Sequence, residues 1–194
     1  GVARDCTGVI VAVIDTGVDY NHPDLAASIW TNPGEIPGNG VDDDGNGFVD
    51  DVHGWDAHDD EGDPMDDHGH GTHVAGTIAA VADNGFGVVG VAPSAKVMAV
   101  RVLDAYGNGW LDQIASGVIY AANRGARVLN LSLGTSWPDA APQTLRDAIA
   151  YAHDVKGAVV VAAAGNSASD VGTVALGVFP AAFRDVVTVA ATHS

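Results

Sequence analysis

The sequence predicts an α/β protein built on an open, mostly parallel sheet. Short runs rich in Val, Ile and Ala recur along the chain, and such runs are typical of parallel strands buried on both faces. Segments with apolar residues at helical spacing separate several of these runs. At 194 residues, 47% of them hydrophobic, the chain fits one domain and is long enough to bury a core.

The expected strands and helices follow one another along the chain. We expect strands over residues 9–14, 96–103, 127–133, 158–163 and 185–190. We expect helices over residues 70–81, 111–123 and 144–155, with Gly125 ending the second. Residues 30–55 are rich in Gly, Asp, Asn and Pro and are expected to form a long loop.

Two polar motifs stand at the ends of these elements. The first expected strand ends in Asp15, directly before Thr16 and Gly17, and open α/β sheets place their sites at that end of a strand. The second motif begins at His70, at the start of a helix of small residues. An imidazole can take and return a proton near neutral pH, but it needs an acid to orient it and a nucleophile to serve. Together the motifs indicate acid–base chemistry.

Four ordered motifs resemble the subtilisin-like serine proteases. They are Val-Ala-Val-Ile-Asp-Thr-Gly at 11–17, His-Gly-Thr-His-Val-Ala-Gly at 70–76, Asn-Leu-Ser-Leu-Gly at 130–134 and Ala-Ala-Ala-Gly-Asn at 162–166. The resemblance runs from about residue 7 to the last residue. It implies a three-layer, doubly wound, mostly parallel sheet flanked by helices, and a serine endopeptidase that uses an Asp-His-Ser triad.

The resemblance also implies roles for single residues. His70 would be general base and then general acid, Asp15 would hold its tautomer, and Asn166 would donate a hydrogen bond to the developing oxyanion. The alternative for Asn166 is a buried amide that satisfies a turn.

Two segments would bind an extended polypeptide substrate. By resemblance, Gly107, Asn108 and Gly109 present their backbone to the peptide, because glycine permits close approach and main-chain pairing. Without the family match, this segment reads as a surface turn. By resemblance, one wall of the primary specificity pocket consists of Ser132, Leu133 and Gly134.

The nucleophile of the family is missing from the sequence. The family's serine opens a helix downstream of the strand expected at 185–190, and the sequence stops before that helix. Ser136 falls in an expected surface loop, and Ser167 is better placed to cap or turn than to attack. We therefore expect residues 1–194 to be a single partial peptidase domain, truncated before the nucleophile helix and inactive alone. The absent helix would leave an apolar cleft that binds the remaining C-terminal part of the domain or a second copy.

The charge of the chain is strongly negative and unevenly placed. The formal net charge is −17, and no Lys or Arg occurs between Asp5 and Ala95, where 18 of the 25 acidic residues lie. This balance argues against nucleic acid as a partner, and no run reaches the length of a membrane span. The resemblance implies a secreted protein whose targeting segment lies outside this sequence.

An acidic region at about 30–67 contains a segment, 42–53, with the spacing of a calcium loop. Oxygen-bearing side chains stand at loop positions 1, 3, 5 and 9, and Gly47 stands at position 6, where such a loop turns sharply. Because His53 replaces the usual glutamate at position 12, a neighbouring aspartate would have to complete the shell. The expected ligands are Asp42, Asp44, Asn46, Phe48 through its carbonyl, Asp50 and Asp51. The alternative is a solvated acidic turn.

The resemblance implies two further calcium sites. In some family members the loop before the histidine motif binds calcium, although Met65 here replaces a common oxygen ligand. The matching ligands would be Asp56, Glu61 and Asp63. Another site would use Asp24 and Asn84, for which a plain turn remains the alternative.

Three functional hypotheses follow. The first is a calcium-stabilised endopeptidase of which this chain is one part. The second is a non-catalytic calcium-binding or interaction module that retains a protease fold. A zinc cluster of His68, His70 and His73 is a third, but closed zinc sites favour sets of four Cys and His ligands.

Overall fold

The computed structural model describes residues 5–136, 142–166 and 178–191. Its main sheet has six strands in the order β2-β3-β1-β4-β6-β8, and every neighbouring pair is parallel. The strands are β1 (Ile10–Asp15), β2 (Gly54–Asp56), β3 (Lys96–Arg101), β4 (Val128–Leu131), β6 (Val159–Ala163) and β8 (Val186–Val189). Because β3 and β4 flank β1 on opposite sides, the chain winds outward in both directions from β1, which confirms the doubly wound prediction.

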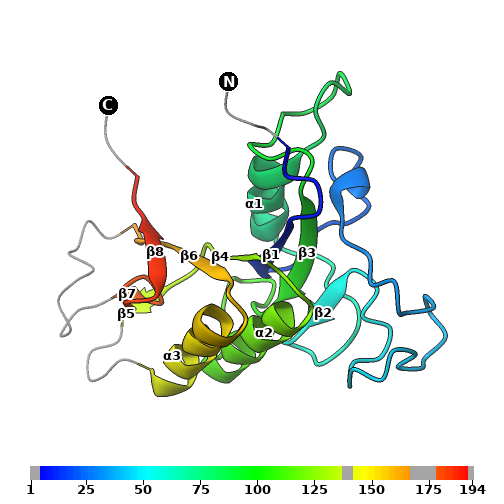
Figure 1. Ribbon diagram of the computed structural model, residues 1–194. Coiled ribbons are helices and arrows are strands. Elements are labelled where there is room, and N and C mark those ends of the chain that lie inside the picture. The colour runs from blue at the N-terminus through cyan, green and yellow to red at the C-terminus, as the bar shows by residue number, and fades with distance from the viewer. Residues whose placement is uncertain (1–4, 137–141, 167–177, 192–194) are drawn as a thin grey trace.

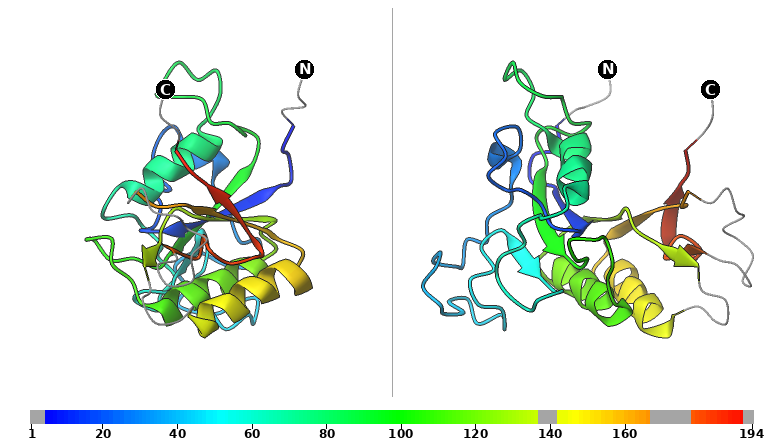
Figure 2. Two further views of the ribbon diagram at one scale, coloured as in Figure 1. Left: turned by 90° about the vertical axis from the view of Figure 1, so that its left-hand side faces the viewer. Right: turned by 180° about the vertical axis from the view of Figure 1, so that it is seen from behind.

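Helices cover the sheet from both sides (Figures 1 and 2). Helix α1 (His70–Ala79) packs on one face against β1 and β3. Helices α2 (Leu111–Asn123) and α3 (Gln143–Ala150) lie side by side on the opposite face. The chain continues from α3 into a π-helical turn, Tyr151–Val155, and an earlier 3-10 turn spans Ala26–Ser28. The three predicted layers are therefore present.

Three short strands lie outside the predicted set. Strand β2 falls at the end of the expected loop, where Trp55 is buried against the rings of Phe48 and Tyr120. A separate antiparallel pair joins β5 (Thr135–Ser136) to β7 (Val178–Phe179). Ser136 thus lies in a strand, and the expectation of a surface loop at that position is wrong. Two or three residues are too few for an alternating pattern to show in the sequence.

Alternating residues of β1 build a core on each face of the sheet. Ile14 is fully buried in the larger cluster with residues of α2 and α3, whereas Val13 is fully buried on the other face with Ala75 of α1. Burying a side chain such as Ile14 contributes about 1.5–3 kcal/mol. The two clusters hold β1 rigidly, and β1 carries the first polar motif at its end.

The face of β6 and β8 on the α1 side is apolar and uncovered by any described helix (Figure 2). Val159, Val187 and Val189 are 47%, 53% and 55% exposed. Partly exposed valines on successive parallel strands are unusual, because parallel sheets are normally covered on both faces. The structure therefore has an apolar face where the sequence predicts a cleft.

Candidate active site

Asp15 and His70 meet at the carboxyl edge of the sheet. Asp15 is the last residue of β1, and His70 is the first residue of α1, 55 positions later. The Nδ1 atom of His70 lies 2.7 Å from Oδ1 of Asp15, which is a hydrogen bond to a charged acceptor. Asp15 is fully buried, whereas the His70 side chain is 45% exposed. The Nδ1 atom of the imidazole is thus fixed by the acid, and the rest of the ring remains partly accessible.

A glycine allows the helix to approach the strand this closely. A Cβ atom on Gly71 would overlap the carbonyl oxygen of Gly17 and lie 3.2 Å from Cβ of Asp15. The backbone N–H of Gly71 instead donates a 3.0 Å hydrogen bond to Oγ1 of Thr16. The sequence His-Gly at the start of α1 therefore brings the imidazole against the end of β1.

The fold holds one oxygen of the Asp15 carboxylate with two hydrogen bonds and buries the other. Its Oδ1 accepts hydrogen bonds from His70 and from the backbone N–H of Thr16 at 2.8 Å. Its Oδ2 is buried without a partner among the described residues. The buried carboxylate therefore depends on the His70 ring and the Thr16 N–H for its hydrogen bonds.

The glycine segment expected to bind a peptide forms a tight, exposed loop. Asp104 anchors it, because its Oδ1 accepts the backbone N–H groups of Tyr106 and Asn108, each at 2.8 Å. The N–H of Asn108, with support from Tyr106, holds the pKa of Asp104 below its ordinary value although burial opposes this. Tyr106 and Trp110 flank the segment and are 85% and 72% exposed.

The structure brings the two expected substrate segments to one cavity of about 630 Å³. Gly107, Asn108 and Gly109 line one side of it, and Leu133 and Gly134 line another. Apolar side chains from α2, α3 and β7 complete the lining, among them Ile114, Leu145 and Phe179. Ser132 does not line this cavity, and its Oγ accepts a 2.9 Å hydrogen bond from the amide of Asn130.

Asn166 follows β6 at the same edge of the sheet as Asp15. It is exposed, and Gly165 before it turns the chain with a φ of 88°. The side chain is therefore not the buried turn amide that was the alternative. Ser167 and residues 192–194 lie outside the described residues.

The acidic loop brings some of its expected calcium ligands together with one that the spacing does not include. Glu35, Asp42 and Asp44 each offer a carboxylate oxygen within 4.8 Å of the others. Burial opposes the ionisation of Asp44, but hydrogen bonds from Asn32 and Asn46 and the charge of Arg124 outweigh it, so its pKa is lowered. Glu35 was missed because it precedes the twelve-residue pattern.

The other expected ligands of this loop make hydrogen bonds and ring contacts within the protein. Asp51 is fully buried and accepts a 2.7 Å hydrogen bond from the Tyr120 hydroxyl. Asp50 accepts backbone N–H groups from residues 39 and 40, and the side-chain oxygen of Asn46 accepts the N–H of Phe48. The Phe48 ring packs edge-on against Trp55. Asp50 and Asp51 therefore lie outside the three-carboxylate cluster, whereas Asn46 and the Phe48 carbonyl remain expected ligands.

The second acidic segment forms a cluster that already contains a cation. Asp56, Asp59 and Glu61 converge within 4.8 Å, and Nη1 of Arg101 lies 2.9 Å from Asp56 and 3.5 Å from Asp59. Burial raises the pKa of Asp56 despite hydrogen bonds from Asp59 and His58 and the charge of Arg101.

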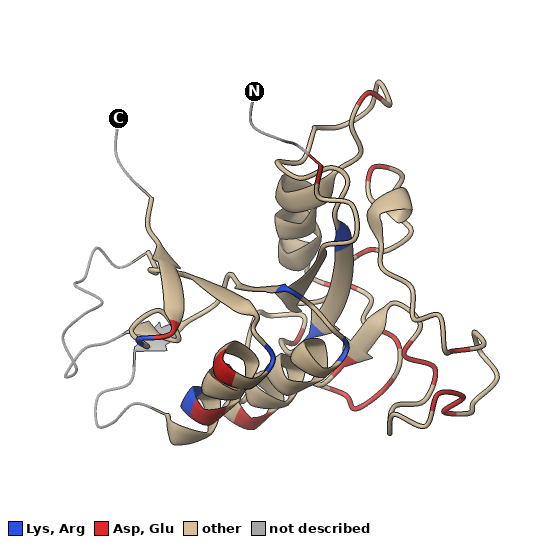
Figure 3. Cartoon of the chain, in the orientation of Figure 1, with Lys and Arg blue, Asp and Glu red and all other residues tan. Residues whose placement is uncertain are grey.

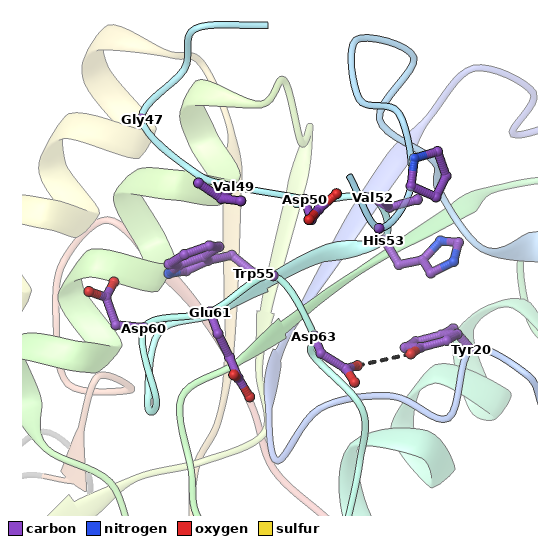
Figure 4. A pocket seen from close by; sticks show the side chains of 13 residues that line it. Tyr20, Gly47, Val49, Asp50, Val52, His53, Trp55, Asp60, Glu61 and Asp63 are labelled. Atoms are coloured by element: carbon purple, nitrogen blue, oxygen red, sulfur yellow. Dashed lines mark hydrogen bonds between the residues drawn. The ribbon is translucent and has the colours of Figure 1, made fainter. Parts of the chain in front are cut away.

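Asp63, the third expected ligand of that segment, is not in its cluster. It accepts a 2.9 Å hydrogen bond from the hydroxyl of Tyr20, beside His53 (Figure 4). Burial, with this hydrogen bond, raises the pKa of Tyr20 to about 12. The third carboxylate near Asp56 and Glu61 is instead that of Asp59, which the sequence analysis did not include.

The third expected pair is in contact. The amide nitrogen of Asn84 donates a 2.6 Å hydrogen bond to Oδ1 of Asp24, and the N–H of Val88 donates to Oδ2 at 3.0 Å. These two donors, Val88 first, lower the pKa of Asp24. The side-chain oxygen of Asn84 accepts the N–H of Phe86, so the pair is held here by hydrogen bonds.

The acidic loops lie together at one side of the molecule, beyond β2 (Figure 3). Two arginines reach them from outside: Arg124, directly after α2, bonds Asp44 at 3.0 Å, and Arg101 bonds the second cluster. His68, His70 and His73 do not form a metal-binding group among the described residues, which leaves the zinc hypothesis without support. Within the same part of the chain, none of the helices has the length and apolarity that crossing a bilayer requires.

Comparison with known proteins assigns the family. A sequence model of the Subtilase family matches residues 6–194. The chain belongs to the subtilase family. This subtilase is 42% identical over 190 residues to the thermophilic serine proteinase of Bacillus sp. (strain AK1), in an alignment that covers 98% of this chain and 40% of the relative. It is 39% identical over 186 residues to thermitase of Thermoactinomyces vulgaris, covering 96% of this chain and 56% of thermitase.

Solved structures agree with the sequence relatives. Sphericase superposes on this subtilase with a TM-score of 0.73 at 31% identity, covering 94% of this chain and 53% of sphericase. The S41 psychrophilic protease gives a TM-score of 0.73 at 32% identity, covering 94% and 52%. The chain spans about half the length of the relatives it matches.

Proposed function

We propose that the chain is the part of a subtilisin-like serine endopeptidase that supplies the acid, the base and the oxyanion donor. The 2.7 Å hydrogen bond between His70 and Asp15, at the carboxyl edge of a parallel sheet, carries this proposal. The family membership of the chain supports it. The nucleophilic serine would come from the part of a full-length subtilase that this chain does not include.

The chain's own residues would act on the protons of the reaction. His70 would accept the serine hydroxyl proton through Nε2 as the serine oxygen bonds to the substrate carbonyl carbon, and it would return that proton to the amine that leaves when the C–N bond breaks. Asp15 would keep Nδ1 protonated and balance the imidazolium charge. Asn166 would donate a hydrogen bond to the oxyanion of the tetrahedral intermediate.

An extended polypeptide would bind across the cavity between the two substrate segments. The exposed backbone of Gly107, Asn108 and Gly109 would pair with it like an added strand. The apolar lining from Leu133, Leu145 and Phe179 favours a peptide with an apolar side chain at this position. Ser132 and Gly134 would contact the neighbouring part of the peptide.

Calcium would stabilise the acidic loops. The side chains of Glu35, Asp42 and Asp44 offer only oxygen ligands, which a hard cation prefers. The backbone packs closely around them, because a Cβ atom on Gly34 would lie 2.6 Å from Cβ of Asp44. The second cluster fits the expected ligand set less well, because Asp63 lies outside it; an arginine pairs with each cluster, Arg124 with Asp44 and Arg101 with Asp56. At Asp24 a shared cation would require the Asn84 amide to turn its oxygen toward the carboxylate. Calcium at extracellular concentration would suit a secreted enzyme, which is the location we propose.

The uncovered apolar face of β6 and β8 would bind the remaining C-terminal part of the catalytic domain. Its valines would become buried as the sheet gains cover on this side. Scattering at high concentration tests whether the chain alone associates through this face. Mixing with the downstream segment should abolish that association.

Labelling with a fluorophosphonate probe tests the proposed activity. The 194-residue chain alone should not react, and the chain expressed with the downstream part of its own gene should be labelled. His70→Ala in that longer protein should remove the labelling, because the serine loses its base. A folded longer protein that is never labelled would overturn the proposal and favour a non-catalytic module with a protease fold.

A further inference from the structure

Asp66 lies four residues before His70 and accepts hydrogen bonds from two sides of the site. Its Oδ1 accepts from the backbone N–H groups of His68 at 3.0 Å and Gly69 at 2.8 Å, and from Oγ1 of Thr16 at 2.9 Å. Its Oδ2 accepts from the backbone N–H of Thr72 at 2.9 Å and from the Thr72 hydroxyl at 2.6 Å. Five donors therefore converge on one carboxylate, and none of them is a charged side chain.

These bonds cap the helix that carries His70. The first N–H groups of a helix have no partner within the helix, and Gly69 before α1 has no side chain to supply one. Asp66 accepts the N–H of Thr72, and Thr16 accepts the N–H of Gly71 at 3.0 Å. A negative charge at this end also complements the helix dipole. The start of α1 is thus held from outside the helix.

The same bonds close a circuit around the Asp15–His70 contact. Thr16 donates its hydroxyl to Asp66 and its backbone N–H to Oδ1 of Asp15. Gly71, bonded to that hydroxyl, directly follows His70, whose ring returns to Oδ1 of Asp15. Asp15 is thus linked to the Asp66 carboxylate through Thr16. His70 is linked to it through Gly71, which bonds the Thr16 hydroxyl.

Asp66 is suited to stay ionised in this place. Burial alone would raise its pKa, but the hydrogen bonds from Thr72, Gly69 and His68 outweigh burial and lower it. An uncharged side chain of the same shape could not accept from all five donors, because an amide nitrogen facing Thr72 would meet two donors.

We propose that Asp66 is a positioning residue, which sets the hydrogen bond between Asp15 and His70 by holding Thr16 and the start of α1 in register. Its importance for catalysis rests on the proposed function. Its effect on the His70 ring does not, and can be measured in the 194-residue chain.

The first experiment follows the ring N–H of His70 by NMR in the isotope-labelled 194-residue chain. Hydrogen bonding to a buried carboxylate should give a far-downfield, slowly exchanging signal in the parent. Asp66→Asn should shift or broaden this signal at a temperature where circular dichroism shows the chain folded. The matched control Asp67→Asn removes the same charge one position away, from a half-exposed carboxylate that pairs with Arg101, and should keep the signal. A folded Asp66→Asn chain with the parent's signal would overturn the proposal.

A second pair of variants covers the case in which Asp66→Asn does not fold. Thr16→Val keeps the shape of the side chain but removes the hydroxyl that links Asp66 to Gly71, whereas Thr16→Ser retains it. The valine variant should lose the His70 signal, and the serine variant should keep it. Equal signals in both would contradict the circuit.

A kinetic measurement on the longer protein separates this inference from the proposed function. If that protein is a peptidase, Asp66→Asn should lower kcat by about 10²-fold with KM unchanged, since a misplaced base slows the chemical step without touching the peptide. A fall confined to KM would count against positioning. Failure of the longer protein to react with a fluorophosphonate would remove the proposed function, while the NMR result would still decide the role of Asp66.

Discussion

Replacing Tyr120 by Phe should destabilise the chain by detaching the acidic loop from α2. The Tyr120 hydroxyl donates a 2.7 Å hydrogen bond to Oδ2 of Asp51, and both side chains are buried, at 2% and 0% exposure. Asp51 otherwise depends on the amides of Asn32 and Asn46, at 2.8 and 3.2 Å. Burial and the adjacent Asp51 charge raise the pKa of Tyr120 well above its ordinary value, so the hydroxyl is a donor at any pH of interest.

The size of the effect follows from the charge and burial of the acceptor. A hydrogen bond to a charged group contributes about 1.5–3 kcal/mol, and loss of the phenol leaves Oδ2 of this buried carboxylate with only the 3.2 Å hydrogen bond from the Asn46 amide. We therefore expect the free energy of unfolding to fall by about 2 kcal/mol, which lowers Tm by roughly 4–8 °C in a chain of this size.

Thermal and urea unfolding, followed by tryptophan fluorescence, measures this change. Tyr151→Phe is the matched control, because the Tyr151 hydroxyl donates at 2.8 Å to Asn123 in an exposed setting. The control should change the free energy of unfolding by less than about 0.5 kcal/mol. Equal losses for Tyr120→Phe and Tyr151→Phe would refute the argument that the buried carboxylate depends on its phenol.

Three further predictions concern the site and its loops. Gly71→Ala should destabilise by about 1–3 kcal/mol and weaken the His70 ring signal, because the new methyl group overlaps the Gly17 carbonyl; an unchanged signal would contradict the close approach. Calcium at a hundred times its dissociation constant should stabilise the chain by about 2.7 kcal/mol, and chelator should reverse this. Asp44→Ala should abolish that response and Asp43→Ala, outside the cluster, should keep it; a calcium-induced Tm shift of parental size in Asp44→Ala would exclude this cluster. Because the folded-state pKa of Asp66 is lowered, the stability it contributes is present above about pH 3.9 and is lost as the pH falls through its folded-state pKa. Asp66→Asn should therefore make the free energy of unfolding fall less steeply as the pH is lowered below about 3.9. An unchanged pH dependence in this range would contradict the assigned hydrogen bonds.

Local patterns in the sequence were sufficient where one element determines its own structure. The predicted helix at 111–123 has the observed bounds, because its apolar residues keep helical spacing and Gly125 takes up a left-handed turn with a φ of 86°. The strand before Asp15 lies where its apolar run predicts, displaced by one residue. The third helix is divided, since a π-helical turn begins at Tyr151.

The sequence was a poor guide where contacts join distant segments. Strand β2 exists because Trp55 packs against rings from the loop and from α2, and three residues carry no periodic signal. Glu35 and Asp59 enter the acidic clusters from outside the expected spacing. Asp66 was missed for the same reason, although an acid shortly before the first turn of a helix is a capping signal that could have indicated it.

Arg101 stands where three segments come together at the end of β3. Its guanidinium bonds Asp56 at the end of β2, Asp67 before the histidine helix at 3.0 Å and the carbonyl of Leu103 ahead of the glycine loop. A planar fork with several fixed donors can serve three directions at once, whereas an ammonium group is a single point of charge on a flexible stem. Lysine at this position would keep the positive charge but could not bond all three segments at once. The residue is therefore constrained by its shape, and exchanging it for lysine should let the end of β2, the segment before α1 and the segment after β3 move more independently of one another.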